Sequence, residues 1–291
     1  MFGDCTNIDY SNIQKKVKTI LIPYFVFSIL TYFFWFFLGR HFGEDKELAI
    51  PLLKPLVGIL YSVATGEWLH FNTPLWFLTC LFIVAIIYYF ISKVNKNSIR
   101  IILVFLIVLI GYLLSLTRLI ILPWSLNISL IAIVFLEFGF ISKKLIIDFS
   151  NQRKLVIFIL LILSLLLTCF FSYVNGRIDM SSNQYGNILF FYLGAFFGIS
   201  GTIFFSILIP KISIIEFIGK NTIIILALHG IIASFIKGIM VYILNIELSI
   251  LEFRIFPNII FTLITLLLSL PLIAIINRYF PIIIGRKKMI P

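Results

Sequence analysis

Long apolar stretches without charged residues follow one another through the whole chain, and each has about the length of a membrane span. A transmembrane helix needs about 20 apolar residues in a row, which soluble helices rarely contain. Hydrophobic residues make up 61% of the sequence and charged residues 12%, so too little polar surface remains to cover a soluble core. The sequence therefore predicts an all-α, polytopic helix bundle in the cell membrane and excludes a soluble globular protein.

We expect a single membrane domain over residues 1–291, with eight candidate spans at 19–39, 71–92, 101–117, 119–142, 155–176, 187–210, 221–246 and 255–277. Residues 40–70 form an expected external loop. Pro51, Lys54 and Pro55 interrupt the apolar part of this loop, which favours an interfacial or re-entrant segment over a ninth span.

In the 187–210 span, the GxxxG spacing of Gly194 and Gly198 predicts close packing against a neighbouring helix.

The basic residues lie in short clusters between the spans. Of the 23 Lys and Arg residues, 16 fall on one side of the predicted topology and six on the other, and Lys237 lies within a span. This asymmetry predicts that both termini are cytoplasmic. The net charge of +11 is therefore an orientation signal that faces lipid head groups, and we expect the lipid bilayer as a partner and no nucleic acid.

Two ionisable residues lie inside the predicted spans at similar depth. His229 is eight residues from the cytoplasmic end of its span, roughly 12 Å deep, and Glu137 is five residues from the end of its own, roughly 8 Å deep. Because a carboxylate in lipid needs a partner, we expect the two side chains to touch. They are the candidate catalytic residues, with a proton-handling or substrate-binding role. The alternative is a buried hydrogen bond that only holds two helices together.

The external loop carries histidines and acids without metal-ligand spacing, which favours a solvated loop over a metal or glycan site. These residues are His41, Glu44, Asp45, Glu47, Glu67 and His70. We expect no metal cofactor.

Four short motifs, in order along the chain, resemble the membrane acyltransferase-3 family. They begin at Lys15 (KKVKTILIPY), Asn72 (NTPLWFL), Leu122 (LPWSLN) and Phe217 (FIGKNT, leading to His229). The most similar branch is the fucose 4-O-acetylase-like one, which includes proteins named for polysaccharide intercellular adhesin export.

The resemblance implies a multi-span enzyme that moves an acyl group, usually acetyl from acetyl-CoA, onto a hydroxyl of a cell-envelope sugar. It also implies about ten spans, with a general-base histidine in the first helix; the third helix of the family resembles the 19–39 span. The chain is therefore expected to lack the first two helices. Either its start codon is misassigned, or the chain is a true fragment without activity.

The resemblance places the candidate substrate- or CoA-binding residues in the matched motifs: Lys18, Tyr24, Trp76 and Asn221. Lys18 is expected to attract a CoA phosphate at the cytosolic face. The expected acceptor is a glycan or lipid-linked sugar. The competing hypothesis is an export component that moves a polysaccharide or lipid-linked sugar without chemistry.

Overall fold

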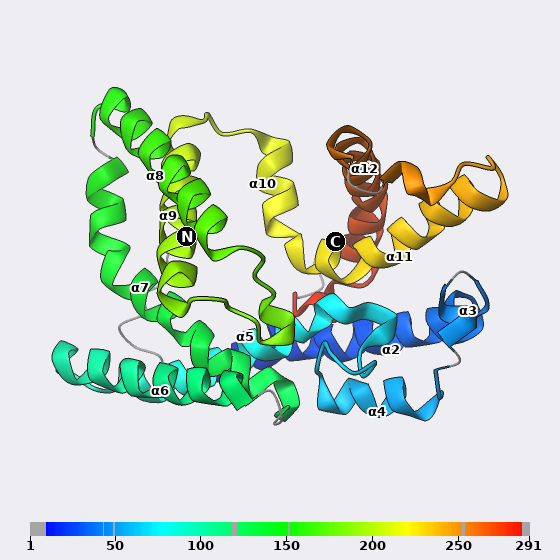
Figure 1. Cartoon of the computed structure of the whole chain (residues 1–291), viewed down its shortest axis with the longest axis horizontal. Helices are drawn as coiled ribbons and strands as arrows, with labels where there is room; N and C mark the ends of the chain where they lie inside the picture. The colour runs from blue at the N-terminus through cyan, green and yellow to red at the C-terminus, as the bar shows by residue number, and fades with distance from the viewer. Residues whose placement is uncertain are drawn as a thin grey trace. The chain divides into compact units, whose positions relative to one another are not determined.

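The structure is a computed structural model that describes residues 10–42, 44–48, 50–117, 121–150, 152–251 and 254–286. These residues are helical, apart from turns and one isolated β-bridge between Asp179 and Gln184, so the all-α prediction is confirmed (Figure 1). The described residues form two compact units, residues 83–216 and residues 10–82 with 217–286. The single membrane domain stays a prediction.

Among the described residues, seven helical segments are long and apolar enough to cross a membrane: Ile13–His41, His70–Ser92, Asn97–Thr117, Lys154–Asn175, Ile188–Leu208, Thr222–Tyr242 and Ile255–Tyr279. They match seven of the eight expected spans, and the chain is a polytopic membrane protein. The expected 119–142 span corresponds to helix α7, Leu126–Ser150, which is not among the seven. The eighth span and the orientation of the termini therefore stay predictions.

The first unit is built from two helical hairpins. It contains the last part of α5 (Trp76–Ser92), α6 (Asn97–Thr117), η4 (Pro123–Ser125), α7, α8 (Lys154–Asn175), η5 (Met180–Ser182), α9 (Ile188–Leu208) and the start of α10 (Ser213–Lys220). Helix α6 packs on α7, and α8 packs on α9. Asn187 caps α9, because its Oδ1 accepts the backbone N–H groups of Leu189 and Phe190 at 3.0 and 3.3 Å.

The glycines of α9 lie directly against α8. A Cβ added at Gly194 would lie 3.4 Å from the Phe171 Cβ, and one at Gly198 would lie 3.6 Å from the Thr168 Cγ2. The next glycine, Gly201, is equally close to Ser164. Small residues let two helix backbones approach in lipid, so the packing expected from the GxxxG spacing is confirmed.

The second unit surrounds helix α2 (Ile22–Phe37). It also contains α1 (Tyr10–Lys16), η1 (Val17–Leu21), η2 (Gly39–His41), α3 (Glu44–Leu48), α4 (Leu53–Tyr61), η3 (His70–Leu75), the start of α5, the end of α10, α11 (Thr222–Tyr242), η6 (Leu248–Leu251), α12 (Ile255–Tyr279) and η7 (Pro281–Ile284). Helix α11 contacts both α12 and α2, and α2 contacts α4, η3 and η7.

Helix α4 runs antiparallel along α2. The Tyr32 hydroxyl donates to the Leu52 carbonyl at 3.2 Å, and the Tyr24 hydroxyl donates to the Ile59 carbonyl at 2.6 Å. The two tyrosines are eight residues apart on α2, about 12 Å along the helix axis, and α4 follows that length in the reverse direction. The interfacial or re-entrant position of this segment in the bilayer stays a prediction.

Gly58 of α4 fixes the loop that follows. A Cβ at this position would lie 1.7 Å from the backbone oxygen of Trp68, an atom that cannot move aside as a side chain does. Gly58→Ala is therefore expected to destabilise the protein by about 1–3 kcal/mol, since the loop must shift away from α4. Thermal unfolding in detergent measures this loss of stability. The control is Gly238→Ala on α11, where an added Cβ has nothing within 4 Å; equal stability of the two variants would contradict the prediction.

Candidate functional site

A polar cluster joins the start of α11 to the end of α12 in the second unit. Asn221, which directly precedes α11, is 4% exposed and donates from Nδ2 to the Phe217 carbonyl at 2.7 Å. Its Oδ1 accepts hydrogen bonds from Asn277 Nδ2 at 2.9 Å and from Arg286 Nη1 at 3.1 Å. The buried amide is thus hydrogen-bonded to three other residues of the chain, as a buried polar group requires.

Arg286 brings a cation to this cluster. Its Nη2 donates to the Lys220 carbonyl at 2.7 Å, and its Nη1 also donates to Asn277 Oδ1. The preceding residue, Gly285, has φ +68° and lies against η1, where an added Cβ would be 2.3 Å from the Lys18 carbonyl oxygen. The side chains of Lys18 and Arg286 are both exposed. This end of the unit therefore presents the Arg286 guanidinium beside a buried amide, and the Lys18 backbone lies against the residue before Arg286.

The sequence predicted two of these residues, Lys18 and Asn221, and missed Asn277 and Arg286. Arg286 belongs to a basic run after the last span, a pattern that is also typical of a cytoplasmic orientation signal. Its hydrogen bonds connect residues 65 and 66 positions apart in the sequence, which no local pattern indicates.

His229 lies on α11, half-buried, eight residues beyond Asn221 and so about 12 Å along the helix axis. Its Nδ1 lies 3.0 Å from the Ile225 carbonyl oxygen and 2.9 Å from that of Leu226. A carbonyl oxygen only accepts, so Nδ1 carries the proton. In the neutral ring the lone pair is then on Nε2, which no described residue hydrogen-bonds. A positioned imidazole nitrogen of this kind can take a proton from a hydroxyl.

Glu137 has a complete set of partners within the first unit. The two carboxylate oxygens accept hydrogen bonds from Arg100 Nε, at 2.8 Å to Oε1 and 3.0 Å to Oε2. Oε2 also accepts a hydrogen bond from the Tyr88 hydroxyl at 2.8 Å. Glu137 and Arg100 are both 5% exposed, and the guanidinium also lies over the Phe140 ring at 4.3 Å. His229 belongs to the other unit, so the expected contact between Glu137 and His229 stays a prediction.

The other two predicted residues are Tyr24 on α2 and Trp76 at the start of α5. Tyr24 is fully buried, and its hydroxyl donates a hydrogen bond to the Ile59 carbonyl. Trp76 is the first residue of α5 and is half-buried. Just before it, Asn72 is 5% exposed and donates to the Ala227 carbonyl of α11 at 2.7 Å. Asn72 Oδ1 is buried without a hydrogen-bond partner among the described residues.

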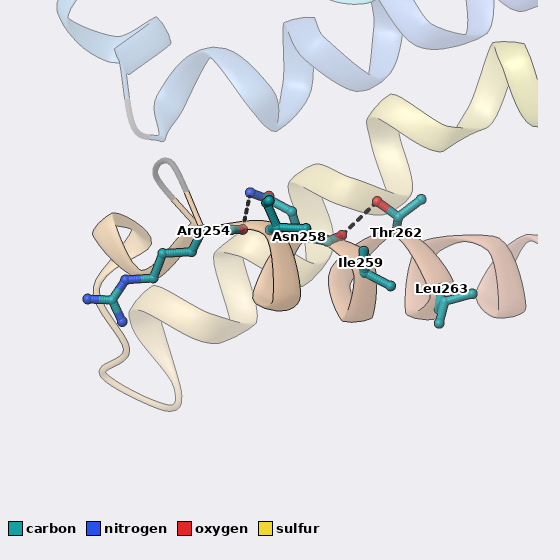
Figure 2. Close-up of a pocket in the computed structure, with 6 residues that line it drawn as sticks. Arg254, Asn258, Ile259, Thr262 and Leu263 are labelled. Atoms are coloured by element: carbon teal, nitrogen blue, oxygen red, sulfur yellow. Dashed lines mark hydrogen bonds between the residues drawn. The ribbon is translucent and has the colours of Figure 1, made fainter. Parts of the chain in front are cut away.

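A separate, open pocket lies along the first turns of α12, lined by Arg254, Ile255, Asn258, Ile259, Thr262 and Leu263 (Figure 2). All of these residues come from one helix and the residue before it, and none is a predicted site residue. Figure 2 shows Arg254 at one end, pointing away from the other lining side chains. Within the described part of the chain, no group of three His, Cys, Asp or Glu side chains could hold a metal ion.

The comparisons with known proteins agree with the motifs. A family model described as an acyltransferase domain matches residues 6–278, which is nearly the whole chain. No curated protein and no solved structure matches the sequence. Four motifs and a match of this length point to the same group, and the chain belongs to the acyltransferase 3 family.

Proposed function

We propose that the protein is a membrane O-acyltransferase that moves an acyl group, normally acetyl, from acyl-CoA to a hydroxyl of a cell-envelope sugar. Membership of the acyltransferase 3 family implies acyl transfer at a membrane. The observation that supports an acyl-CoA donor is exposed Arg286, which is hydrogen-bonded to buried Asn221, with exposed Lys18 on the segment that packs against Gly285. The motifs favour the fucose 4-O-acetylase-like branch, with a glycan or lipid-linked sugar as acceptor.

The Lys18–Arg286 end of the second unit suits an anionic acyl donor. Arg286 is held by Asn221, Asn277 and the Lys220 carbonyl, so its guanidinium is already oriented before a ligand arrives. A fixed guanidinium matches the phosphates of CoA, which carries the acyl group as a thioester, and Lys18 adds a second positive charge to this end of the unit. Both residues belong to the side that the charge asymmetry predicts to be cytosolic.

His229 is the proposed general base of the transfer. Its Nδ1–H is fixed on the Ile225 and Leu226 carbonyls, so Nε2 accepts the proton of the acceptor hydroxyl. The hydroxyl oxygen then forms the ester bond as the carbon–sulfur bond breaks, and the proton passes to the CoA thiolate. His229 lies about 12 Å along α11 from Asn221, on the same unit.

The remaining predicted residues are Glu137, Tyr24 and Trp76, and none of them is proposed to transfer a proton. The Arg100 and Tyr88 hydrogen bonds occupy Glu137, so it enters as a structural ion pair rather than as a second base. Tyr24 is buried against α4 and positions that helix. Trp76, half-buried at the start of α5, stays a candidate substrate contact.

Replacing Arg286 tests the donor site. Arg286→Ala is expected to weaken CoA binding about 10-fold or more, because a hydrogen bond to a charged group contributes about 1.5–3 kcal/mol. Arg286→Lys keeps the charge but loses the paired donors, so we expect an intermediate effect. Equilibrium binding of radiolabelled CoA to the full chain in detergent, at two salt concentrations, measures this.

Arg254→Ala is the matched control, because Arg254 is also exposed and directly precedes α12 at its other end. Its removal is expected to leave CoA affinity within twofold of the wild type. If both variants bind CoA as the unmodified protein does, the donor site lies elsewhere.

A further inference from the structure

The external loop contains a structured histidine–carboxylate pair rather than only solvated side chains. His70 Nε2 lies 2.8 Å from Asp45 Oδ1, and Trp35 Nε1 donates to Asp45 Oδ2 at 2.8 Å. Both carboxylate oxygens are therefore occupied. Because the carboxylate accepts, Nε2 carries a proton and the neutral ring has its lone pair on Nδ1. No described residue hydrogen-bonds this Nδ1, and the His70 side chain is 23% exposed.

Packing holds this pair in one orientation. Trp35 is 4% exposed and belongs to a core cluster with Tyr32, Ile50 and Ile59. Its ring meets the His70 ring edge-to-face, with 6.2 Å between centroids. A hydrogen-bond acceptor held in this way loses little conformational entropy when it binds a ligand.

A second set of polar and aromatic groups lies just before His70 on the same loop. Lys54 Nζ forms an ion pair with Glu67 Oε2 at 2.9 Å, and it lies 5.8 Å from the centre of the Trp68 ring. The Tyr61 ring is 4.8 Å from the Trp68 ring. The Lys54 and Glu67 side chains are 37% and 43% exposed. The loop thus offers hydrogen-bond donors and acceptors next to aromatic rings.

The loop also contacts α11 close to the proposed base. Asn72, two residues after His70, donates to the Ala227 carbonyl, two residues before His229. Along α2, in contrast, Trp35 is 17 residues from Lys18, or about 25 Å. The histidine–carboxylate pair is therefore far from Lys18 along α2 and linked to α11 beside His229.

We propose that this loop binds the sugar acceptor, with a sugar hydroxyl donating to His70 Nδ1. This inference rests on the proposed function and adds a place for the acceptor. Lys54 and Glu67 supply a donor and an acceptor to neighbouring hydroxyls, and the indole of Trp68 contacts the apolar face of a ring. The only lysine of the set is neutralised by Glu67, and Asp45 adds a negative charge, so a neutral polyhydroxyl ligand fits better than an anionic one.

The test uses cell-envelope polysaccharide stripped of its O-acyl groups, with the full chain in detergent. His70→Gln is expected to raise the KM for this acceptor about fivefold to tenfold, the loss of one good hydrogen bond, with kcat and the KM for acetyl-CoA within twofold of wild type. His41→Gln is the matched control, since His41 is an exposed histidine of the same region, and we expect no change in any constant. Glu67→Gln, at an exposed position, is expected to raise the acceptor KM about twofold to fivefold even if His70→Gln folds poorly.

A fall in kcat with an unchanged acceptor KM, or no change at all, would overturn the assignment of this loop. A separate binding measurement, by tryptophan fluorescence with the same polysaccharide and without acetyl-CoA, covers the case in which the wild type transfers no acetyl group. Weaker binding by His70→Gln in that case supports the sugar site while the proposed function fails. Equal binding by the two proteins, or none by the wild type, rejects the sugar site itself.

Discussion

Replacing Glu137 with leucine is expected to destabilise the protein by about 3–5 kcal/mol, the largest effect on stability that we predict. The change removes the partner of Arg100, which is 5% exposed, and so leaves an uncompensated guanidinium inside the first unit. The Tyr88 hydroxyl loses its acceptor as well. Thermal unfolding of the full chain in detergent, followed by loss of the monodisperse species, measures the effect.

The double variant Arg100→Leu with Glu137→Leu is the control. Replacing both members of a buried ion pair with apolar residues is often neutral or stabilising, so we expect it to recover most of the stability that the single variant loses. Tyr88→Phe keeps the ion pair and is expected to fall between wild type and Glu137→Leu. If Glu137→Leu unfolds at the wild-type temperature, the ion pair does not support the unit.

Replacing His229 with alanine is expected to lower kcat of acetyl transfer about 10²–10⁴-fold, the usual contribution of a general base. The KM for acetyl-CoA should change little, because Asn221, which hydrogen-bonds Arg286 of the proposed donor site, lies about 12 Å away along α11. Stability should also change little, since among the described residues the ring hydrogen-bonds only to carbonyls of its own helix. Release of CoA from acetyl-CoA in the presence of envelope polysaccharide measures kcat.

His70→Gln is the matched histidine variant for this experiment, because its expected effect is on the acceptor KM and not on kcat. A His229→Ala protein that keeps kcat within threefold of wild type would show that another group takes the proton. The two histidine variants therefore separate catalysis from acceptor binding in a single set of kinetic measurements.

The helices were predictable because a helix that spans lipid needs a long uncharged segment. Such a segment is continuous in the sequence and can be recognised without knowledge of tertiary contacts. The same holds for the glycine contacts of α9, where residue size alone decides how close two helices come. The helix that differed most was the expected 119–142 span. It became α7, which starts at Leu126 after the short η4 turn at Pro123–Ser125.

The pairing of polar groups was not predictable in the same way. The sequence marks Glu137 as a costly buried charge, but it does not identify Arg100, buried in α6, as its partner. Arg286 and Asn277 reach Asn221 across more than 50 residues of sequence. The Asp45–His70 pair, expected to be solvated, is fixed by Trp35 from another helix. Each of these pairs joins residues that are distant in the sequence, so no local spacing of residues predicts it.

The most direct test of the account is acetyl transfer by the purified full chain in proteoliposomes. With ¹⁴C-acetyl-CoA on the side of Lys18 and Arg286 and de-O-acylated envelope polysaccharide as acceptor, we expect alkali-labile label on the polysaccharide and an equal amount of released CoA. Both signals should fall at least 10²-fold with His229→Ala. Polysaccharide that crosses the membrane without gaining label, at any acetyl-CoA concentration, would contradict the acyltransferase and identify an export component instead.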